Sequence, residues 1–140
     1  MSIIGILTGA TFGPWRMPQR AQNMIMNQYA AKKDAQIEYV IAEGLFYHFY
    51  PRTRMALQFR DISELFFTSA YQIPVEGDAA DMFAETFKKK IIHFSLEGIS
   101  GVGGEIIDSL TKELKVFHNN ESLMGELSNR PYSAFKEHHV

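Results

Sequence analysis

Short apolar segments that alternate with helical patterns constrain the fold of this chain more than any other feature. The first segment, residues 3–8, is an apolar run rich in isoleucine, which is typical of a strand buried on both faces. Comparable segments occupy residues 37–41, 62–70 and 91–96. Runs of this length suit strands, so we expect four strands at these positions.

Helical patterns fill the gaps between these segments. Pro18 suits the first turn of a helix, where its missing N–H would be unpaired in any case. The lysine pair at 32–33 suits the last turn of the same helix, because the helix dipole favours cations there. Further helices are expected after Pro51, after Gly77 and across residues 106–114.

Strict alternation of strands and helices predicts parallel strands with helices on both faces. We therefore expect residues 1–117 to form a single α/β domain, a small three-layer Rossmann-like or flavodoxin-like fold with a mainly parallel sheet of four to five strands. The glycine-rich residues 99–104 are expected to form a turn before the last helix. Residues 118–140 are polar and weakly periodic, so we expect a loosely packed C-terminal tail.

Composition excludes several functional classes. The chain has no cysteine, which excludes disulfides, thiolate metal sites and a cysteine nucleophile. Its five histidines follow no metal-binding spacing, and the glycines match neither a phosphate-binding loop nor a dinucleotide fingerprint, so we expect no metal and no cofactor. The net charge of −2 argues against a nucleic-acid partner.

The hydropathy of the chain bears on where the protein resides. No apolar run approaches the roughly 20 residues of a membrane span, so we expect no membrane-spanning segment. The first residues lack the basic head and the small-residue cleavage site of a signal peptide. We therefore expect a cytoplasmic protein.

In a parallel α/β sheet, ligands bind outside the carboxyl ends of the strands. This rule selects the loops at residues 8–17, 42–51, 70–77 and 97–104. The first loop and the helical turn after it hold the side chains that we expect to bind an anionic substrate, which are Thr8, Thr11, Arg16, Gln19 and Arg20. Two arginines four residues apart beside a helix N-terminus suit a phosphate or a carboxylate. The alternative is that both arginines lie on the surface and pack on Trp15 or pair with acids.

The second loop is unusually aromatic at residues 45–50, and Arg52 follows it. Aromatic rings stack on sugars or bases, and Arg52 is expected to hold an anion beside them. The alternative is that Phe46 and Phe49 belong to the core or to a contact between copies. A contiguous apolar patch usually marks a contact surface, so we expect a homo-oligomer formed through Phe46, Tyr47, Phe49 and Tyr50.

The last two loops supply the candidate catalytic groups. Glu97 follows the fourth strand, where we expect it to act as a general base or a hydroxyl acceptor, and Tyr71 is expected to be a second hydrogen-bond donor. His93, Ser95 and Glu97 do not form a serine–histidine–acid relay, because side chains two apart on a strand point the same way and do not aim at each other. His93 is instead expected to be a hydrogen-bonded core histidine.

Several of these residues resemble a known pattern. Residues 17–23, Met-Pro-Gln-Arg-Ala-Gln-Asn, with Tyr-Ala at 29–30, are similar to an Ile-Pro-Gln-Arg-x-Gln-Asn…Tyr-Ala segment of the sporadic carbohydrate cluster protein family. The likeness continues through residues 71–74 to residues 93–97, which are similar to a His-Phe-Ala-Leu-Glu stretch of that family. It spans roughly residues 3–99 and implies a bacterial surface-polysaccharide context without implying a reaction. A fainter likeness links the chain to the catalytic-domain fold of serine recombinases, but threonine stands where those enzymes have their serine.

Two hypotheses about function follow. The first is a small enzyme of bacterial surface-carbohydrate biosynthesis that acts on a phosphorylated or nucleotide-linked sugar. In it, Arg16 and Arg20 hold phosphate, Gln19 and the threonines position the sugar, and Glu97 is the acid or base. The second is a non-catalytic module that binds a sugar or nucleotide, or docks on a partner through its aromatic segment.

Overall fold

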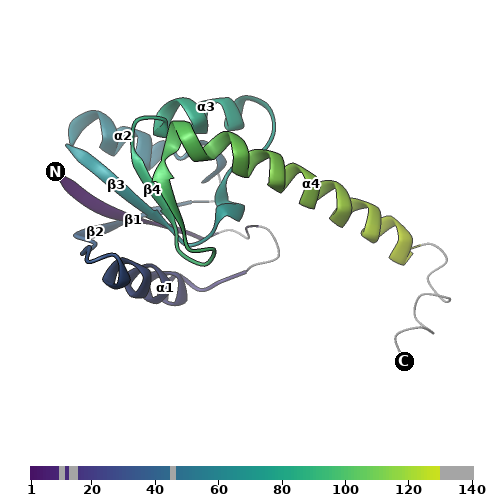
Figure 1. The fold of residues 1–140 in the computed structure, drawn as a ribbon, viewed down its shortest axis with the longest axis horizontal. Helices are drawn as coiled ribbons and strands as arrows, with labels where there is room; N and C mark the ends of the chain where they lie inside the picture. Colours follow the sequence, from purple (N-terminus) through teal and green to yellow (C-terminus); the bar gives the residue numbers. More distant parts are fainter. Residues whose placement is uncertain (10–11, 13–15, 45–46, 130–140) are drawn as a thin grey trace.

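The computed structural model describes residues 1–9, 12, 16–44 and 47–129. Within these residues, five strands form one sheet in the order β2-β1-β3-β4-β5 (Figure 1). Strands β2, β1, β3 and β4 are parallel to one another, and β5 is antiparallel to β4. The strands are β1 (Ser2–Thr8), β2 (Tyr39–Glu43), β3 (Ile62–Phe67), β4 (Ile91–Phe94) and β5 (Ile99–Val102). The expected α/β class with a mainly parallel sheet is confirmed.

Helices connect the strands and cover the sheet. Figure 1 shows α1 on one face and α2, α3 and the start of α4 on the other. The short 3-10 turns η1 and η2 precede α2 and α3. The bounds are α1 (Gln19–Lys32), η1 (Tyr47–Phe49), α2 (Pro51–Phe59), η2 (Ala70–Gln72), α3 (Gly77–Phe87) and α4 (Gly103–Asn129).

Two buried apolar clusters follow from the alternation of side chains along the strands. Ile4 and Ile6 of β1 belong to the larger cluster, which includes residues of α3 and α4. Leu7 faces the other way, into a smaller cluster with Met26 of α1. Most of the aromatic side chains of the core lie in the larger cluster, and their rings meet mostly edge to face. They include Tyr50, Phe67, Phe83, Phe87 and Phe94.

The prediction of a turn at residues 99–104 is wrong. Residues 99–102 are strand β5, and α4 begins at the next residue. Gly98 has a φ of +66°, a conformation that glycine adopts without strain, and it lets the chain reverse direction after β4. The ladder with β4 then stabilises a strand that the glycines of this segment disfavour.

The predicted aromatic contact patch at residues 45–50 is also wrong in part. Tyr50 is 1% exposed and packs in the core, whereas Phe49 is 42% exposed. The Tyr50 hydroxyl donates a 2.6 Å hydrogen bond to the Gln72 carbonyl oxygen, which ties this loop to η2. Phe46 lies outside the described residues.

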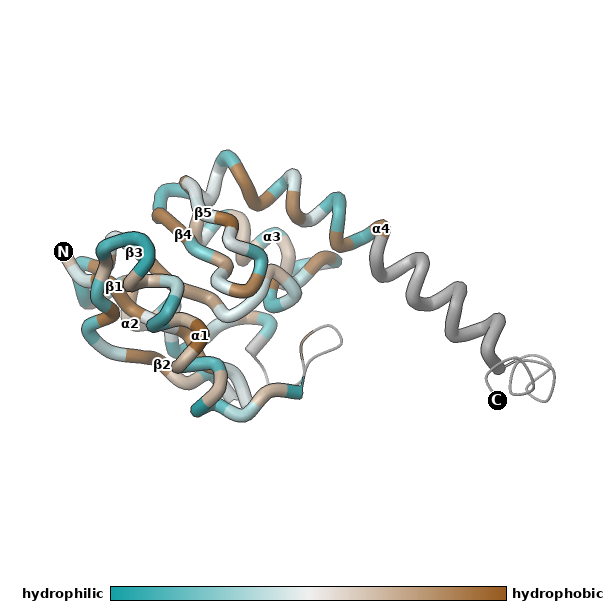
Figure 2. Tube along the Cα trace, turned by 60° about the horizontal axis from the view of Figure 1, so that its bottom comes forward, coloured by the Kyte–Doolittle hydropathy of each residue, from teal (hydrophilic) through white to brown (hydrophobic). Residues whose placement is uncertain are grey.

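Helix α4 continues to Asn129, well past the predicted domain boundary at residue 117, and Figure 1 shows its later part extending away from the sheet. Figure 2 shows hydrophobic and hydrophilic residues alternating along its first part. The inward positions there, Ile107, Leu110 and Leu114, are buried in the larger cluster. In the part of the chain that the structure describes, no helix is both long enough and apolar enough to cross a membrane. The rest of the predicted tail, residues 130–140, lies outside the described residues.

Candidate functional site

The loop between β1 and α1 is anchored at both ends by one buried side chain, Gln22. Its Oε1 accepts a 3.0 Å hydrogen bond from the Thr8 backbone N–H, and its Nε2 donates to the Thr8 carbonyl oxygen at 2.7 Å. The same Nε2 donates to the Met17 carbonyl oxygen at 2.9 Å. Gln22 is not among the binding residues predicted from the sequence. The available signal was a glutamine four residues before the buried Met26, on the inward face of the helix.

The anchored loop borders a hollow of about 310 Å³ at the carboxyl end of β1. We call it the β1 hollow; its described lining residues are Thr8, Gly9, Arg16, Met17, Pro18 and Gln19. Three of the predicted substrate-binding residues are thus brought together. The volume is at the lower end of the range for small-molecule pockets.

Thr8 has an unusual environment in this hollow. It is fully buried, and its hydroxyl oxygen has no hydrogen-bond partner among the described residues. Burying a hydroxyl without a partner costs roughly 1–3 kcal/mol. Because Thr8 also lines the hollow, a ligand bound there that reaches this oxygen would supply the missing hydrogen bond.

The N-terminus of α1 opens onto the same hollow. Pro18 is its N-cap residue, so no side chain caps the first turn, and that turn holds no acidic residue. The first N–H groups of a helix carry a partial positive charge and suit an anion. Arg16, which is exposed, adds a full positive charge beside them.

The neighbouring strand β3 ends in a second polar cluster. Gln72 is fully buried, and its Oε1 accepts hydrogen bonds from the Thr68 and Ser69 backbone N–H groups at 2.8 and 3.0 Å. Among the described residues, the Gln72 Nε2 and the Thr68 hydroxyl have no partner. The carboxyl ends of β1 and β3, which are adjacent in the sheet, therefore both carry buried polar atoms that have no partner in the described part of the chain.

Glu97 stabilises this second cluster. Its carboxylate accepts a hydrogen bond from the Ser69 hydroxyl at 2.7 Å and another from the Ala70 backbone N–H at 2.7 Å. These contacts hold η2 against the turn after β4. Both carboxylate oxygens of Glu97 accept hydrogen bonds in these contacts, so the side chain acts to position η2. Tyr71 is partly buried and packs against the larger core cluster.

The remaining predicted residues lie elsewhere. Neither Arg20, Glu97 nor Tyr71 is among the described residues that line the β1 hollow. Arg52 donates to the Ala42 carbonyl oxygen at 3.0 Å and borders a separate, mostly apolar hollow between β2 and α2. Thr11 lies outside the described residues.

His93 confirms the prediction of a hydrogen-bonded core histidine. It is 6% exposed, its Nδ1 lies 2.7 Å from the Ser100 hydroxyl, and its Nε2 lies 3.1 Å from Glu64 Oε2. Burial lowers its pKa below the ordinary value of 6.5; the nearby Glu64 opposes this effect and Lys33 adds to it. The imidazole is therefore kept neutral in the folded protein near neutral pH.

This lowered pKa predicts an acid-sensitive stability. The unfolded chain binds a proton at His93 near pH 6.5, whereas the folded chain binds it only at lower pH. The contribution of His93 is therefore fully present above pH 6.5 and is lost as the pH falls towards the folded-state pKa. We expect the free energy of unfolding, measured by urea denaturation from pH 7.5 to 5, to fall more steeply for the wild type than for His93→Gln. Parallel curves would contradict this prediction.

No protein-family model matches the chain, and no curated protein matches its sequence significantly. The β1 hollow and the polar atoms around it are therefore the features of this molecule that bear on its function.

Proposed function

We propose that this protein binds a phosphorylated or nucleotide-linked sugar in the β1 hollow, within a three-layer, flavodoxin-like domain. The observation that carries the proposal is that Thr8, one of the residues that line the hollow, has a buried hydroxyl with no hydrogen-bond partner among the described residues. In sheets of this kind, ligands bind where the strand order reverses. Here the chain passes from β1 outward to β2 and then back to β3 on the other side of β1.

Charge supports an anionic group on the ligand. The uncapped first turn of α1 offers backbone N–H donors, and Arg16 offers a guanidinium that suits a phosphate. Gln19 borders the same hollow and can hydrogen-bond a sugar hydroxyl through its amide. The sugar itself is suggested by the resemblance of residues 17–23 and 93–97 to the sporadic carbohydrate cluster protein family.

The contacts of Glu97 favour binding over catalysis at this place. A general base must reach the proton that it abstracts, but both Glu97 oxygens already accept hydrogen bonds from Ser69 and Ala70. We therefore assign Glu97 to positioning of η2 beside the strand ends, and not to proton transfer in the β1 hollow.

Thr8→Val tests the proposal most sharply, because valine keeps the shape of threonine and removes only the hydroxyl. Without ligand, the variant is expected to be as stable as the wild type or more stable by up to about 1 kcal/mol, since an unpaired buried group has been removed. With ligand, it is expected to bind at least several-fold more weakly. Thermal denaturation with sugar phosphates, nucleotide sugars, neutral sugars and inorganic phosphate would measure both effects.

Arg16→Ala tests the anion part of the proposal. Loss of a charge-assisted hydrogen bond costs roughly 1.5–3 kcal/mol, so affinity for a sugar phosphate should fall by about tenfold or more. Lys32→Ala is the matched control, because it removes an exposed cation at the far end of the same helix. The proposal fails if no phosphorylated compound raises the melting temperature, or if both alanine variants weaken binding equally.

A further inference from the structure

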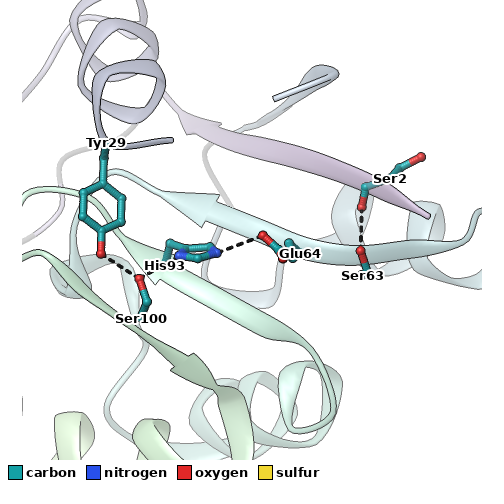
Figure 3. A network of polar contacts seen from close by, with 6 residues as sticks. All are labelled: Ser2, Tyr29, Ser63, Glu64, His93 and Ser100. Carbon is teal, nitrogen blue, oxygen red and sulfur yellow. Dashed lines mark hydrogen bonds and ion pairs between the residues drawn. The ribbon is translucent and has the colours of Figure 1, made fainter. Parts of the chain in front are cut away.

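A further cluster of chemically active side chains, distinct from the two at the strand ends, lies on the face of the sheet that α1 covers. It is independent of the proposed sugar site. Figure 3 shows Tyr29, Ser100, His93 and Glu64 linked in a chain of polar contacts. They come from α1, β5, β4 and β3 respectively. The distances are 2.7 Å from Tyr29 Oη to Ser100 Oγ, 2.7 Å from Ser100 Oγ to His93 Nδ1, and 3.1 Å from His93 Nε2 to Glu64 Oε2.

Strand register brings these side chains together. His93 pairs with Phe66 on one side and with Ser100 on the other, so the three share one face. Glu64 is two residues before Phe66 and therefore points to the same face. Of these residues, only His93 is close to Ser100 in sequence. The antiparallel pairing of β4 with β5 brings the Ser100 hydroxyl beside the His93 ring.

The imidazole is held in a fixed orientation. Its ring stacks on Phe66 with centroids 4.0 Å apart and planes at 9°, and the Tyr29 ring meets it edge to face at 6.1 Å. A neutral imidazole has one donor and one acceptor nitrogen. With Glu64 accepting from Nε2–H, Nδ1 is the acceptor, so Ser100 donates its hydroxyl proton to Nδ1.

We infer that Ser100 is a nucleophile that attacks carboxylic esters, with His93 as its general base. A hydroxyl that donates to a histidine, which is in turn oriented by a carboxylate, is the arrangement that activates serine for acyl transfer. Ser100 is partly exposed and lies on β5, an edge strand of the described sheet. Glu64 is a positioning residue, because it acts through His93.

The reaction has two balanced steps. Ser100 Oγ forms a bond to the ester carbonyl carbon while its proton passes to His93 Nδ1, and the bond to the leaving alcohol breaks as that alcohol takes the proton from Nδ1. Water then attacks the acyl-serine, giving its proton to Nδ1, and Ser100 regains a proton as the carboxylic acid leaves. Tyr29 Oη, 2.7 Å from Ser100 Oγ, donates a hydrogen bond to that oxygen and holds the serine hydroxyl in its orientation towards Nδ1.

A fluorophosphonate reagent tests this inference, because a serine activated in this way displaces its fluoride and keeps the phosphonyl group. Mass spectrometry of the intact full-length protein and of its peptides is expected to show one adduct, on Ser100. The adduct should be absent in Ser100→Ala, and the labelling rate should fall about a hundredfold in His93→Gln. Ser63→Ala, which removes a hydroxyl that donates to the Ser2 carbonyl oxygen on another part of the sheet, should label at the wild-type rate.

Glu64→Gln separates orientation from packing. Its amide can still contact Nε2 but does not stabilise the imidazolium, so labelling should slow at least tenfold. Because Glu64 raises the pKa of His93, its replacement should shift the pH dependence of labelling to lower pH, while circular dichroism stays that of the wild type. The inference is overturned if the wild type forms no adduct on Ser100, or if folded His93→Gln labels that serine as fast as the wild type. A network that serves only to fill the core would give either result.

Discussion

Gln22→Leu is expected to destabilise the protein by on the order of 3–5 kcal/mol. Leucine fits the volume but makes none of the three hydrogen bonds that the buried amide makes to Thr8 and Met17. The N–H and carbonyl of Thr8 would then be buried without partners, and each such group costs roughly 1–3 kcal/mol. Because a domain of this size is stable by only about 5–15 kcal/mol, the variant should unfold at markedly lower urea concentration.

Gln28→Leu provides the matched control for this prediction. It makes the same chemical change on the exposed side of α1, so its stability should stay within about 0.5 kcal/mol of the wild type. Gln22→Leu should also weaken ligand binding in the β1 hollow, since the loop that borders it loses its anchor. Equal urea midpoints for the two variants would show that Gln22 has no anchoring role.

Gly103→Ala is the second change with a large expected effect. A Cβ placed on Gly103 would collide with the Phe87 carbonyl oxygen and come within 2.8 Å of its carbonyl carbon. Both atoms are backbone at the end of α3 and cannot turn aside. The start of α4 would have to move, and with it the hydrogen bonds from the Gly103 and Gly104 N–H groups to the Lys90 and Lys88 carbonyl oxygens.

We expect Gly103→Ala to lower the free energy of unfolding by about 2–4 kcal/mol, because overpacking against a rigid neighbour forces the backbone to shift. Gly44→Ala is the control, since a Cβ there meets no atom of the described residues within 4 Å and its φ is not positive. That variant should be neutral to within about 0.5 kcal/mol. If both substitutions have the same small effect in urea denaturation, the close packing of α4 on α3 is not a constraint.

The candidate site was predictable only to the extent that it is local in sequence. Thr8, Arg16 and Gln19 were expected at one place because a strand end, a short loop and a helix start must be close in space. Arg52 and Tyr71 were assigned to the site from the rule about strand ends, but the structure places them outside the β1 hollow. That rule selects an edge of the sheet and does not say how each side chain turns after its strand.

Glu97 and His93 illustrate the same limit. The sequence suggested a catalytic role for Glu97 and a core role for His93. The partners of Glu97 are Ser69 and Ala70, those of His93 are Ser100 and Glu64, and all four lie on other elements. Ser100 itself lies in the segment predicted as a turn, because glycine-rich sequence is typical of turns. Only the antiparallel pairing with β4, which is a contact between distant backbone groups, makes that segment a strand.

The sequence by itself determined the α/β class and the number of parallel strands, because hydrophobic periodicity and helix-start signals act over a few neighbouring residues. The tertiary structure alone decided the strand order, the fifth strand, the burial of Tyr50, and the two polar clusters around Gln22 and His93. Each of these depends on which residues far apart in the chain come within hydrogen-bonding or packing distance, and that is set by the free energy of the whole folded domain.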